Sequence, residues 1–504
     1  MINNQTIEQL MNTSCVGFGT SGARGLAEKM TDEICYAYTI GFIQYLRTIK
    51  DMPVLKSIAI AGDLRPSTAR IMNACAKAIQ DSGLKIINTG TLPSPAIALY
   101  GIENTIPTIM VTGSHIPDDR NGIKFNTAYG EILKADEEGI RSQKIQLTQE
   151  IFNSSGKFIE AENYLPTVNL QAEQLYIARY LKFFPDNALS QLKIGVYQHS
   201  GVARDLISNV LIQLGAEVIN LGRSEIFIPV DTEAVRTEDE RLAKEWVEKY
   251  QLDAIVSTDG DADRPLISDE NGIWFRGDIV GILCAHYLNV QHIITPVSSN
   301  TLVEKAKIFQ QVYRTRIGSP YVIEMMQYAL SQGQKHVAGY EANGGFLSAD
   351  RLEANGQQLS PLPTRDALIV LLSLLHFSKV KQCKMSKLMD GLPGRYTYSG
   401  RIKEIPSDKS MALLNSYINA ERQMEDNMKI KFIQDFSSAL DAQASIVDIN
   451  VVDGLRITLN NDDIIHLRPS GNAPEFRCYT EAGSFEQAYQ LNNKILEIIP
   501  ALIS

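Results

Sequence analysis

Cysteines are few, no hydrophobic run is long and basic residues are not in excess in this sequence of 504 residues. The six cysteines include no C-x-x-C pair, which argues against a disulfide framework or a zinc site and favours a reducing compartment. No cationic start followed by an apolar run opens the chain, so no secretory signal is predicted and a cytoplasmic location is expected. The longest apolar stretch, around residues 367–375, is far shorter than the roughly 20 residues that cross a membrane, and it predicts a buried helix.

Acidic residues outnumber basic ones. The chain has 48 lysines and arginines against 58 aspartates and glutamates, for a formal net charge of −10. This balance excludes a general electrostatic surface for nucleic acid or for an acidic membrane, so we expect small-molecule partners bound at local sites. The hydrophobic fraction of 44% and the charged fraction of 21% are ordinary for globular proteins, and the length suggests about three to four domains.

One pattern occurs three times: a β-branched run, a polar loop, an amphipathic helix and a second β run. The copies span residues 57–88, 193–220 and 292–315. Each predicts a βαβ unit with parallel strands, and each is followed by a further apolar run that ends in a polar loop. In open α/β sheets such loops lie at the carboxyl ends of the strands, where ligands bind.

The last part of the chain has a different pattern. Short alternating strands at 446–452 and 455–459 and a closing amphipathic helix from residue 484 predict a smaller α+β domain. The expected fold class is therefore α/β, with three related domains that have mixed or parallel sheets, followed by this fourth domain. Polar and turn-rich segments place the four domains at residues 1–160, 161–272, 273–382 and 383–504.

Three aspartates alternate in DGDADR (259–264), directly after an apolar run that predicts a buried strand. Asp259, Asp261 and Asp263 repel one another unless a cation neutralises them, and hard oxygen ligands at this spacing suit a divalent cation such as Mg²⁺. An EF-hand is excluded because Arg264 stands where that loop needs glycine and a strand replaces the entering helix. A solvated acidic turn is the alternative.

A serine and a histidine are adjacent in TGSHIPDDRNGIKF (112–125), again after a predicted strand, and Lys124 follows an NG turn. Adjacent side chains on an extended loop project in opposite directions, and no G-x-S-x-G elbow is present. Ser114 and His115 therefore do not indicate a hydrolase triad. Taken alone, this segment is equally consistent with an ordinary loop that carries a hydrogen-bonded histidine.

Three further loops carry candidate binding residues. RPSGNAPEFR combines arginines, a hydroxyl and backbone N–H groups freed by glycine, the set that a phosphate dianion needs, although an exposed turn would look alike. Glu341 and Asn343 in GYEANGGF can hold sugar hydroxyls, as can any tight turn of this composition, and Arg24 in GTSGARG can close over an anion. The phosphate candidates are Arg468, Ser470, Gly471, Asn472 and Arg477.

In chain order, FGTSGARG, TGSHIPDDRNGIKF, DGDADR, GYEANGG and RPSGNAPEFR resemble the signature loops of the α-D-phosphohexomutase family, the phosphomannomutases and phosphoglucomutases. The resemblance spans nearly the whole chain. It implies three related α/β domains and a smaller fourth domain around one central cleft. It also implies a phosphoserine enzyme that moves a phosphoryl group between positions 1 and 6 of a hexose phosphate, through a hexose 1,6-bisphosphate that serves as activator.

By position in the motifs, the resemblance implies that Ser114 carries the phosphate and completes a Mg²⁺ shell made by the three aspartates. Lys124 would be the general acid/base, with His115 near the reacting oxygens, and rotation of the fourth domain would exclude water. The other implied roles are extra positive charge from Arg24 and Arg264, hydroxyl binding by Glu341 and Asn343, and binding of the unreacting phosphate by Arg468, Ser470, Gly471, Asn472 and Arg477.

Several positions depart from the family pattern. Gly113 and Ile116 replace residues of T-A-S-H-N-P, which predicts a more flexible loop, and Asn472 replaces a hydroxyl residue, which predicts retuned phosphate binding. The E-A-N-G-G loop differs from the E-x-S-G-H of phosphoglucosamine mutases and, with LPTRDA after it, is similar to a bacterial phosphomannomutase subgroup. Mannose is the expected sugar, with glucose or dual specificity as the alternative.

Two other activities are weighed against a mutase. A non-catalytic sugar-phosphate-binding protein of this fold would be expected to have lost Ser114 or the aspartates, yet all are present. A metal-dependent phosphatase would release free phosphate without isomer exchange. Both differ from a mutase in the products that they leave.

Overall fold

The structure is a computed structural model that describes residues 3–19, 22–50, 53–146, 151–160, 162–418, 425–469 and 475–503. Contacts divide the chain into two compact units, each built from two stretches of sequence. The first unit is Met1–Ile294 with Gly318–Asp390, and the second is Thr295–Ile317 with Gly391–Ser504.

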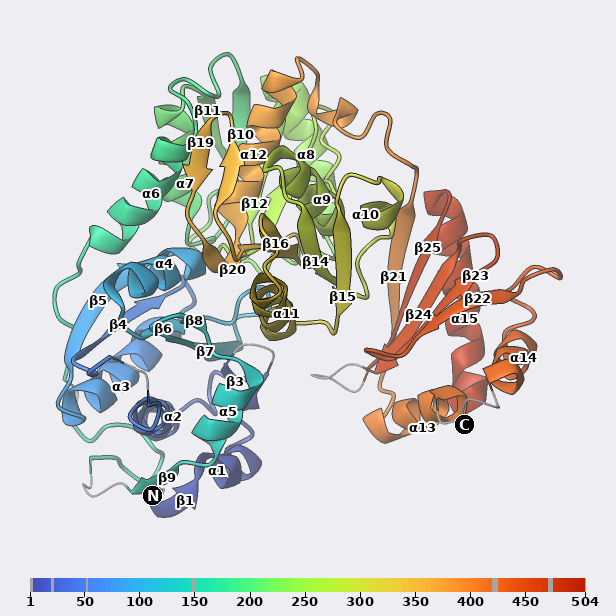
Figure 1. The fold of residues 1–504 in the computed structure, drawn as a ribbon. Coiled ribbons are helices and arrows are strands. Elements are labelled where there is room, and N and C mark those ends of the chain that lie inside the picture. The colour runs from blue at the N-terminus through green and yellow to red at the C-terminus, as the bar shows by residue number, and fades with distance from the viewer. Residues whose placement is uncertain are drawn as a thin grey trace. The chain divides into compact units, whose positions relative to one another are not determined.

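The first sheet of the first unit has seven strands and is mixed. β4 pairs in parallel with β5 and β6, and the antiparallel strands β7, β3 and β2 follow at one edge. Figure 1 shows α4 on one face of this sheet and α2 and α3 on the other. The strands are β2 (Gly17–Phe18), β3 (Ala23–Leu26), β4 (Ser57–Gly62), β5 (Lys85–Thr91), β6 (Thr108–Val111), β7 (Arg120–Thr127) and β8 (Gly130–Glu131). The other elements are β1 (Asn3–Thr6), α1 (Ile7–Ser14), α2 (Asp32–Leu46), α3 (Thr68–Asp81), α4 (Ser94–Asn104), α5 (Lys134–Arg141) and β9 (Lys144–Gln146).

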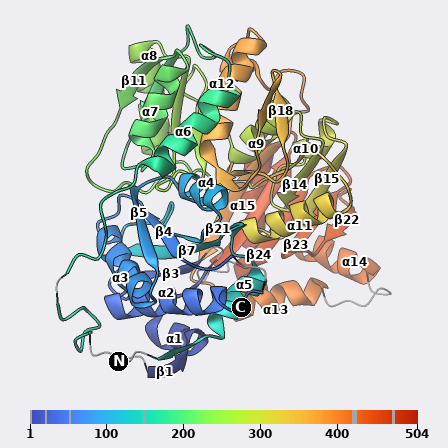
Figure 2. The same ribbon diagram turned by 60° about the vertical axis from the view of Figure 1, so that its left-hand side comes forward.

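The second sheet has the order β11-β10-β12-β13. The first three strands are parallel, as the second βαβ pattern predicts, and β13 returns antiparallel to β12 after the acidic loop. Both views place α6 beside α4 and α7 (Figures 1 and 2). The elements are α6 (Gln171–Phe183), β10 (Lys193–Tyr197), α7 (Arg204–Gln213), β11 (Glu217–Leu221), α8 (Thr237–Tyr250), β12 (Ala254–Thr258) and β13 (Pro265–Ile267).

The third group of strands begins with β14, which pairs in parallel with β16, and continues through antiparallel β17 and β20. The helix predicted around residues 367–375 is confirmed as α12, whose residues from Ala367 to Ser378 are buried. The elements are α9 (Gly277–Tyr287), β14 (His292–Pro296), α11 (Ser319–Ser331), β16 (Val337–Tyr340), β17 (Phe346–Ser348), β18 (Leu352–Ala354), β19 (Gln357–Leu359), β20 (Leu362–Asp366), α12 (Ala367–Val380) and the 3₁₀ turn η1 (Met385–Lys387).

The second unit contains a wholly antiparallel sheet with the order β21-β25-β24-β23-β22, against which α15 and α13 pack. This arrangement confirms the α+β class predicted for the end of the chain. The elements are α10 (Leu302–Lys305), β15 (Gln311–Thr315), β21 (Tyr396–Lys403), α13 (Ser407–Ile418), α14 (Glu425–Asp435), β22 (Ile446–Asn450), β23 (Leu455–Leu459), β24 (Ile464–Pro469), β25 (Glu475–Ala482) and α15 (Phe485–Ile503).

The helix expected in the third βαβ pattern is wrong in length. An amphipathic helix was predicted between the two β runs of residues 292–315, but α10 is a single turn of four residues. Lys307 has a φ of +53°, and a left-handed residue stops a right-handed helix.

All six cysteines are free, which agrees with the absence of a disulfide framework. Among the residues that the structure describes, no helix combines the length and the apolar character needed to cross a bilayer.

Candidate active site

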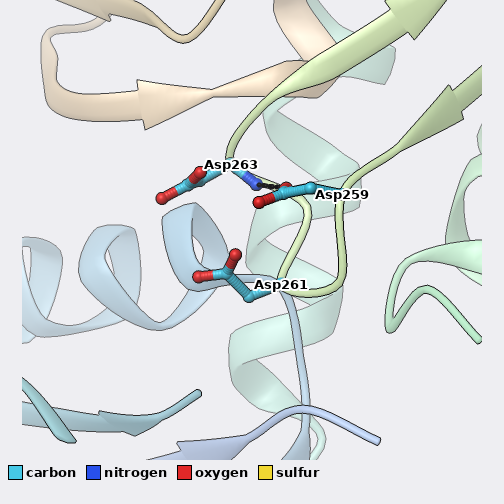
Figure 3. Close-up of side chains that lie close together, drawn as sticks. All are labelled: Asp259, Asp261 and Asp263. Atoms are coloured by element: carbon cyan, nitrogen blue, oxygen red, sulfur yellow. Dashed lines mark hydrogen bonds between the residues drawn. The ribbon is translucent and has the colours of Figure 1, made fainter. Parts of the chain in front are cut away.

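The three aspartates of DGDADR lie on the loop between β12 and β13 and point toward one common space (Figure 3). One carboxylate oxygen from each lies within 4.8 Å of those of the others, and the exposed fractions are 0% for Asp259, 0% for Asp261 and 2% for Asp263. The alternative of a solvated acidic turn is therefore wrong, because the acids are buried. Buried carboxylates need compensating positive charge.

The unused oxygens of this cluster fit a hard divalent cation. Oδ1 of Asp261 and Oδ1 of Asp263 are buried and receive no hydrogen bond from any described residue. Oδ1 of Asp259, by contrast, accepts the backbone N–H groups of Asp263 and Arg264, both at 3.2 Å. Burial and repulsion from the two neighbouring aspartates raise the pKa of Asp259 well above its ordinary value. An all-oxygen set with orphaned lone pairs suits Mg²⁺.

Ser114 lies against this cluster, as the resemblance implies. Its Oγ donates a hydrogen bond of 2.6 Å to Oδ2 of Asp259, and the residue is fully buried. Its φ is +57°, a left-handed conformation that is uncommon outside glycine. The approach of the two loops is close, because a Cβ added to Gly260 would lie 2.6 Å from the Ser114 carbonyl oxygen.

Arg65, which the sequence reading missed, holds the serine loop in place. Its guanidinium is buried, forms an ion pair of 3.1 Å with Asp63 and stacks 4.1 Å from the centroid of the Phe227 ring. Four backbone carbonyls of the loop accept its N–H groups at 2.5–3.1 Å: those of Ser114, Ile116, Pro117 and Arg120. A Cβ added to Gly113 would meet Cζ of Arg65 at 2.6 Å, so this glycine makes room for the clamp.

Lys124, on β7, donates to two of the aspartates. Its Nζ lies 2.5 Å from Oδ2 of Asp261 and 2.7 Å from Oδ2 of Asp263. Burial alone would lower the pKa of Lys124, but the two carboxylates outweigh it and raise that pKa. The side chain is therefore an ammonium group. Ser94, the first residue of α4, adds a donor to Oδ2 of Asp261 at 2.5 Å.

His115 lies beside the serine, and Arg24 and Arg264 add positive charge close to that histidine. Nδ1 of His115 lies 3.4 Å from Oγ of Ser114, and burial together with Arg264 and Arg24 lowers the pKa of this histidine well below its ordinary value, so the ring is neutral. Burial, Arg264 and Arg365 lower the pKa of Arg24 to about 10. Nε of Arg24 and Nε of Arg264 are buried and have no hydrogen-bond partner within the described part of the chain.

Glu341 and Asn343 lie on the turn between β16 and β17 and are buried. Oδ1 of Asn343 accepts the backbone N–H of Gly345 at 2.9 Å, which leaves its Nδ2 for a ligand. Oε2 of Glu341 forms an ion pair of 3.0 Å with Nη1 of Arg365, a residue of β20 that the sequence reading also missed. Only its place in LPTRDA marks it in the sequence.

In the second unit, Arg468 and Arg477 lie directly opposite each other on β24 and β25. Arg401 of β21 lies opposite Arg477 on its other side, so three arginines form one row across neighbouring strands. Opposite residues of an antiparallel pair share a face of the sheet, and like charges placed there repel. Ser470, Gly471 and Asn472, the other predicted phosphate ligands, lie outside the described residues.

Family models and sequence relatives identify the family to which this chain belongs. Family models described as phosphoglucomutase/phosphomannomutase alpha/beta/alpha domains I, II and III match residues 16–150, 174–272 and 276–396. A phosphomannomutase of Salmonella muenchen is 43% identical over 500 residues, covering 99% of this chain and 98% of that protein. A phosphomannomutase of Sinorhizobium fredii is 39% identical over 476 residues, covering 94% of this chain and 96% of that protein.

Solved structures share the fold. A phosphoglucomutase/phosphomannomutase family protein of Burkholderia thailandensis superposes with a TM-score of 0.68 at 18% identity, covering 96% of this chain and 97% of that chain. This likeness shows the fold, and the three family models and the full-length relatives show the kind of enzyme. The chain belongs to the α-D-phosphohexomutase family and is an isomerase that works by phosphoryl transfer.

Proposed function

We propose that the protein interconverts mannose 6-phosphate and mannose 1-phosphate through a phosphoserine at Ser114 and a hexose 1,6-bisphosphate, which also primes the serine as activator. The observation that carries this proposal is the 2.6 Å contact between Oγ of Ser114 and Asp259, in a cluster of three buried carboxylates. A hydroxyl in this position is poised to carry a phosphate beside a divalent cation.

Asp259, Asp261, Asp263 and an oxygen on Ser114 would hold Mg²⁺, which would neutralise charge on the phosphoryl group in transfer. The protein supplies the remaining positive charge. Two arginines, Arg24 and Arg264, present buried Nε groups without a hydrogen-bond partner in the described part of the chain. Buried cations of this kind are stabilised by a phosphate dianion, which offers charge and acceptor oxygens together.

Lys124 is the general acid/base of the proposal. Its raised pKa keeps a proton on Nζ, so the ammonium can donate to the oxygen that leaves phosphorus. His115 is neutral, and its Nδ1 lies 3.4 Å from Oγ of Ser114, so it can accept the proton of that hydroxyl when the serine attacks phosphorus. Lys124 then gives a proton to the sugar oxygen that leaves.

The rest of the substrate is assigned to two further groups of residues. Glu341 accepts, and Nδ2 of Asn343 donates, hydrogen bonds to the sugar hydroxyls in either orientation of the intermediate. The phosphate that is not reacting is bound by Arg468, Ser470, Gly471, Asn472 and Arg477. The same proposal includes domain boundaries after residues 160, 272 and 382. It also includes a rotation of the fourth domain that excludes water.

Mannose is chosen because two full-length relatives of 43% and 39% identity are phosphomannomutases and because the sugar loop reads E-A-N-G-G. Glucose phosphates are the alternative substrates, since glucose differs from mannose at a single stereocentre. A cytoplasmic location stays a prediction.

Phosphorus NMR of the full chain with Mg²⁺, mannose 1-phosphate and a trace of hexose bisphosphate tests the proposal. We expect mannose 6-phosphate to appear without free phosphate. Free phosphate without isomer exchange would indicate a phosphatase, and no change with mannose, glucose or glucosamine phosphates would indicate a binding protein. Parallel reactions with glucose 1-phosphate and glucosamine 1-phosphate measure sugar preference.

A further inference from the structure

Arg365 connects two loops that the proposed function uses for different tasks. It is the penultimate residue of β20 and is 3% exposed. Nε and Nη2 donate to Oδ2 of Asp263 at 3.1 and 2.8 Å, and Nη1 donates to Oε2 of Glu341 at 3.0 Å. One guanidinium therefore joins Asp263 of DGDADR, the metal loop, to Glu341 of E-A-N-G-G, the sugar loop.

The aliphatic carbons of the Arg365 side chain are held in place, as its guanidinium is. A Cβ added to Gly345, the last glycine of E-A-N-G-G, would lie 2.6 Å from Cδ and 2.7 Å from Cγ of Arg365. The absence of a side chain at residue 345 thus lets the arginine lie against the sugar loop. A planar fork that is held along its stem and at three N–H groups has little freedom to reorient.

This arrangement determines which oxygen of Glu341 faces a ligand. Its Oε2 is occupied by Arg365, whereas Oε1 accepts no hydrogen bond from the described residues. Because Nη1 occupies Oε2 and restrains it, Oε1 is the acceptor left for a hydroxyl. The backbone of the turn adds a second restraint, since Glu341 N–H donates to the carbonyl of Gly345 at 3.0 Å.

We propose that Arg365 is a positioning residue that orients Glu341 toward the sugar hydroxyls and ties that carboxylate to the metal loop through Asp263. The inference rests on the proposed function of Glu341 as a hydroxyl acceptor. It assigns Arg365 no contact with the substrate, so its effect on the sugar passes through Glu341.

A double-mutant cycle over Arg365→Gln and Glu341→Gln tests this assignment. If Arg365 acts through Glu341, each single variant raises KM for mannose 1-phosphate by about 10–100-fold, and the double variant is no worse than Glu341→Gln alone. Arg365→Lys keeps the charge but loses the fork, so we expect it to leave KM raised. Arg241→Gln, at an exposed arginine that pairs with Glu245, is the control and should match the unaltered protein.

Calorimetric binding of mannose 1-phosphate without Mg²⁺ gives a second readout that does not depend on turnover. The same non-additive pattern is expected in Kd. Additive effects of the two substitutions, or unaltered binding and KM in Arg365→Lys, would overturn the inference. Circular dichroism checks folding, and the cycle can be measured with Arg365→Lys, which keeps a cation between the buried acids, should the glutamine variant not fold.

The unaltered protein separates the two levels of proposal. If it neither binds nor isomerises any hexose phosphate, the proposed function fails, and the role of Arg365 fails with it. If it is an active mutase and the cycle is additive, only the role of Arg365 fails.

Discussion

Ser114 is held in an unfavourable backbone conformation by its neighbours. A non-glycine residue with a φ of +57° costs of order 1–3 kcal/mol, and such residues persist only where surrounding contacts determine them. Here the N–H of Ser114 donates to Oγ1 of Thr112 at 2.8 Å, and its carbonyl accepts from Arg65 at 2.8 Å. These contacts aim Oγ at Asp259 before any substrate binds.

Replacing Ser114 with alanine removes the proposed phosphate carrier. We expect turnover to fall by at least about 1,000-fold and the free energy of unfolding to fall by only about 1–3 kcal/mol, the cost of leaving a buried carboxylate of Asp259 without one donor. A coupled mutase assay and urea unfolding measure the two quantities. Ser331→Ala is the matched control, because this exposed hydroxyl donates to the carbonyl of Tyr328 and accepts from the side chain of its neighbour Gln332, far from the site in sequence. Normal turnover in Ser114→Ala would move the covalent role to another residue.

Gly113, the residue before Ser114, is the second position at which we expect a substitution to lower stability and activity. The sequence predicted a flexible loop at Gly113, whereas the structure gives the glycine another purpose, which is to leave space for Arg65. Gly113→Ala should displace the guanidinium, lower the free energy of unfolding by about 1–3 kcal/mol and reduce kcat.

Gly483→Ala is a suitable control for this substitution, because a Cβ there meets only Gln487 at an ordinary 3.5 Å. Equal stability and equal kcat of both variants would show that Arg65 does not depend on the space at residue 113.

At the scale of elements, strand pairing decides where charges meet. β24 and β25 bring Arg468 beside Arg477, and β21 adds Arg401. Carboxylates approach all three: Glu475 lies 3.4 Å from Arg401 and 3.6 Å from Arg477, and Asp453 lies 3.4 Å from Arg468. These carboxylates offset the repulsion within the row, and the phosphate site that we propose on these strands would add a further anion.

His466, also on β24, makes the stability of this sheet depend on pH. It is 1% exposed, its Nε2 donates to the carbonyl of Asp453 at 2.6 Å, and burial lowers its pKa to about 4 from an ordinary 6.5. Between pH 6.5 and pH 4 this histidine binds a proton in the unfolded chain but not in the folded one. Its contribution to the free energy of unfolding is therefore fully present at pH 7 and is lost as the pH falls from 6.5 toward 4. The expected loss between pH 7 and pH 5 is about 2 kcal/mol.

Urea unfolding at pH 7 and pH 5 measures this effect. In His466→Gln the amide can still donate to Asp453 but does not titrate, so the pH-dependent loss should be smaller by about 2 kcal/mol than in the unaltered chain. The same pH dependence in both proteins would mean that other groups cause it.

Local patterns predicted elements well and distant partners poorly. A continuous apolar run predicted α12, alternating runs predicted the strands at 446–452 and 455–459, and alternating aspartates after a strand predicted a cluster of carboxylates. Arg65 and Arg365 were missed because their roles come from contacts with residues far away in the sequence. Arg65 contacts residues about 50 positions away, and Arg365 contacts Asp263, 102 positions away. The short α10 was missed because apolar spacing does not show a left-handed stop at Lys307.

At the scale of the molecule, the proposed cation should stabilise the folded chain. Mg²⁺ at 100 times its Kd should raise the free energy of unfolding by about 2.7 kcal/mol, because the three aspartates come together only in the folded protein. Thermal unfolding with Mg²⁺ and with EDTA measures this shift, and EDTA should also abolish turnover.

Asp261→Asn should lose most of the Mg²⁺-induced increase in Tm, since it removes one ligand charge from the cluster. An unchanged shift in that variant, or no shift in the unaltered protein, would contradict a metal site at these aspartates.

The second unit is assembled from two stretches of chain, and this has a consequence for biosynthesis. Thr301 donates to Glu481, its partner 180 residues later. At about 5–20 residues per second, a ribosome needs about 10–40 s after Thr301 to reach Glu481, so this hydrogen bond cannot form during that time. A fragment that begins at residue 391 would lack this stretch altogether, so Glu481 would keep Arg395 but lose Thr301, and we expect the fragment to be less stable than the same residues in the full chain.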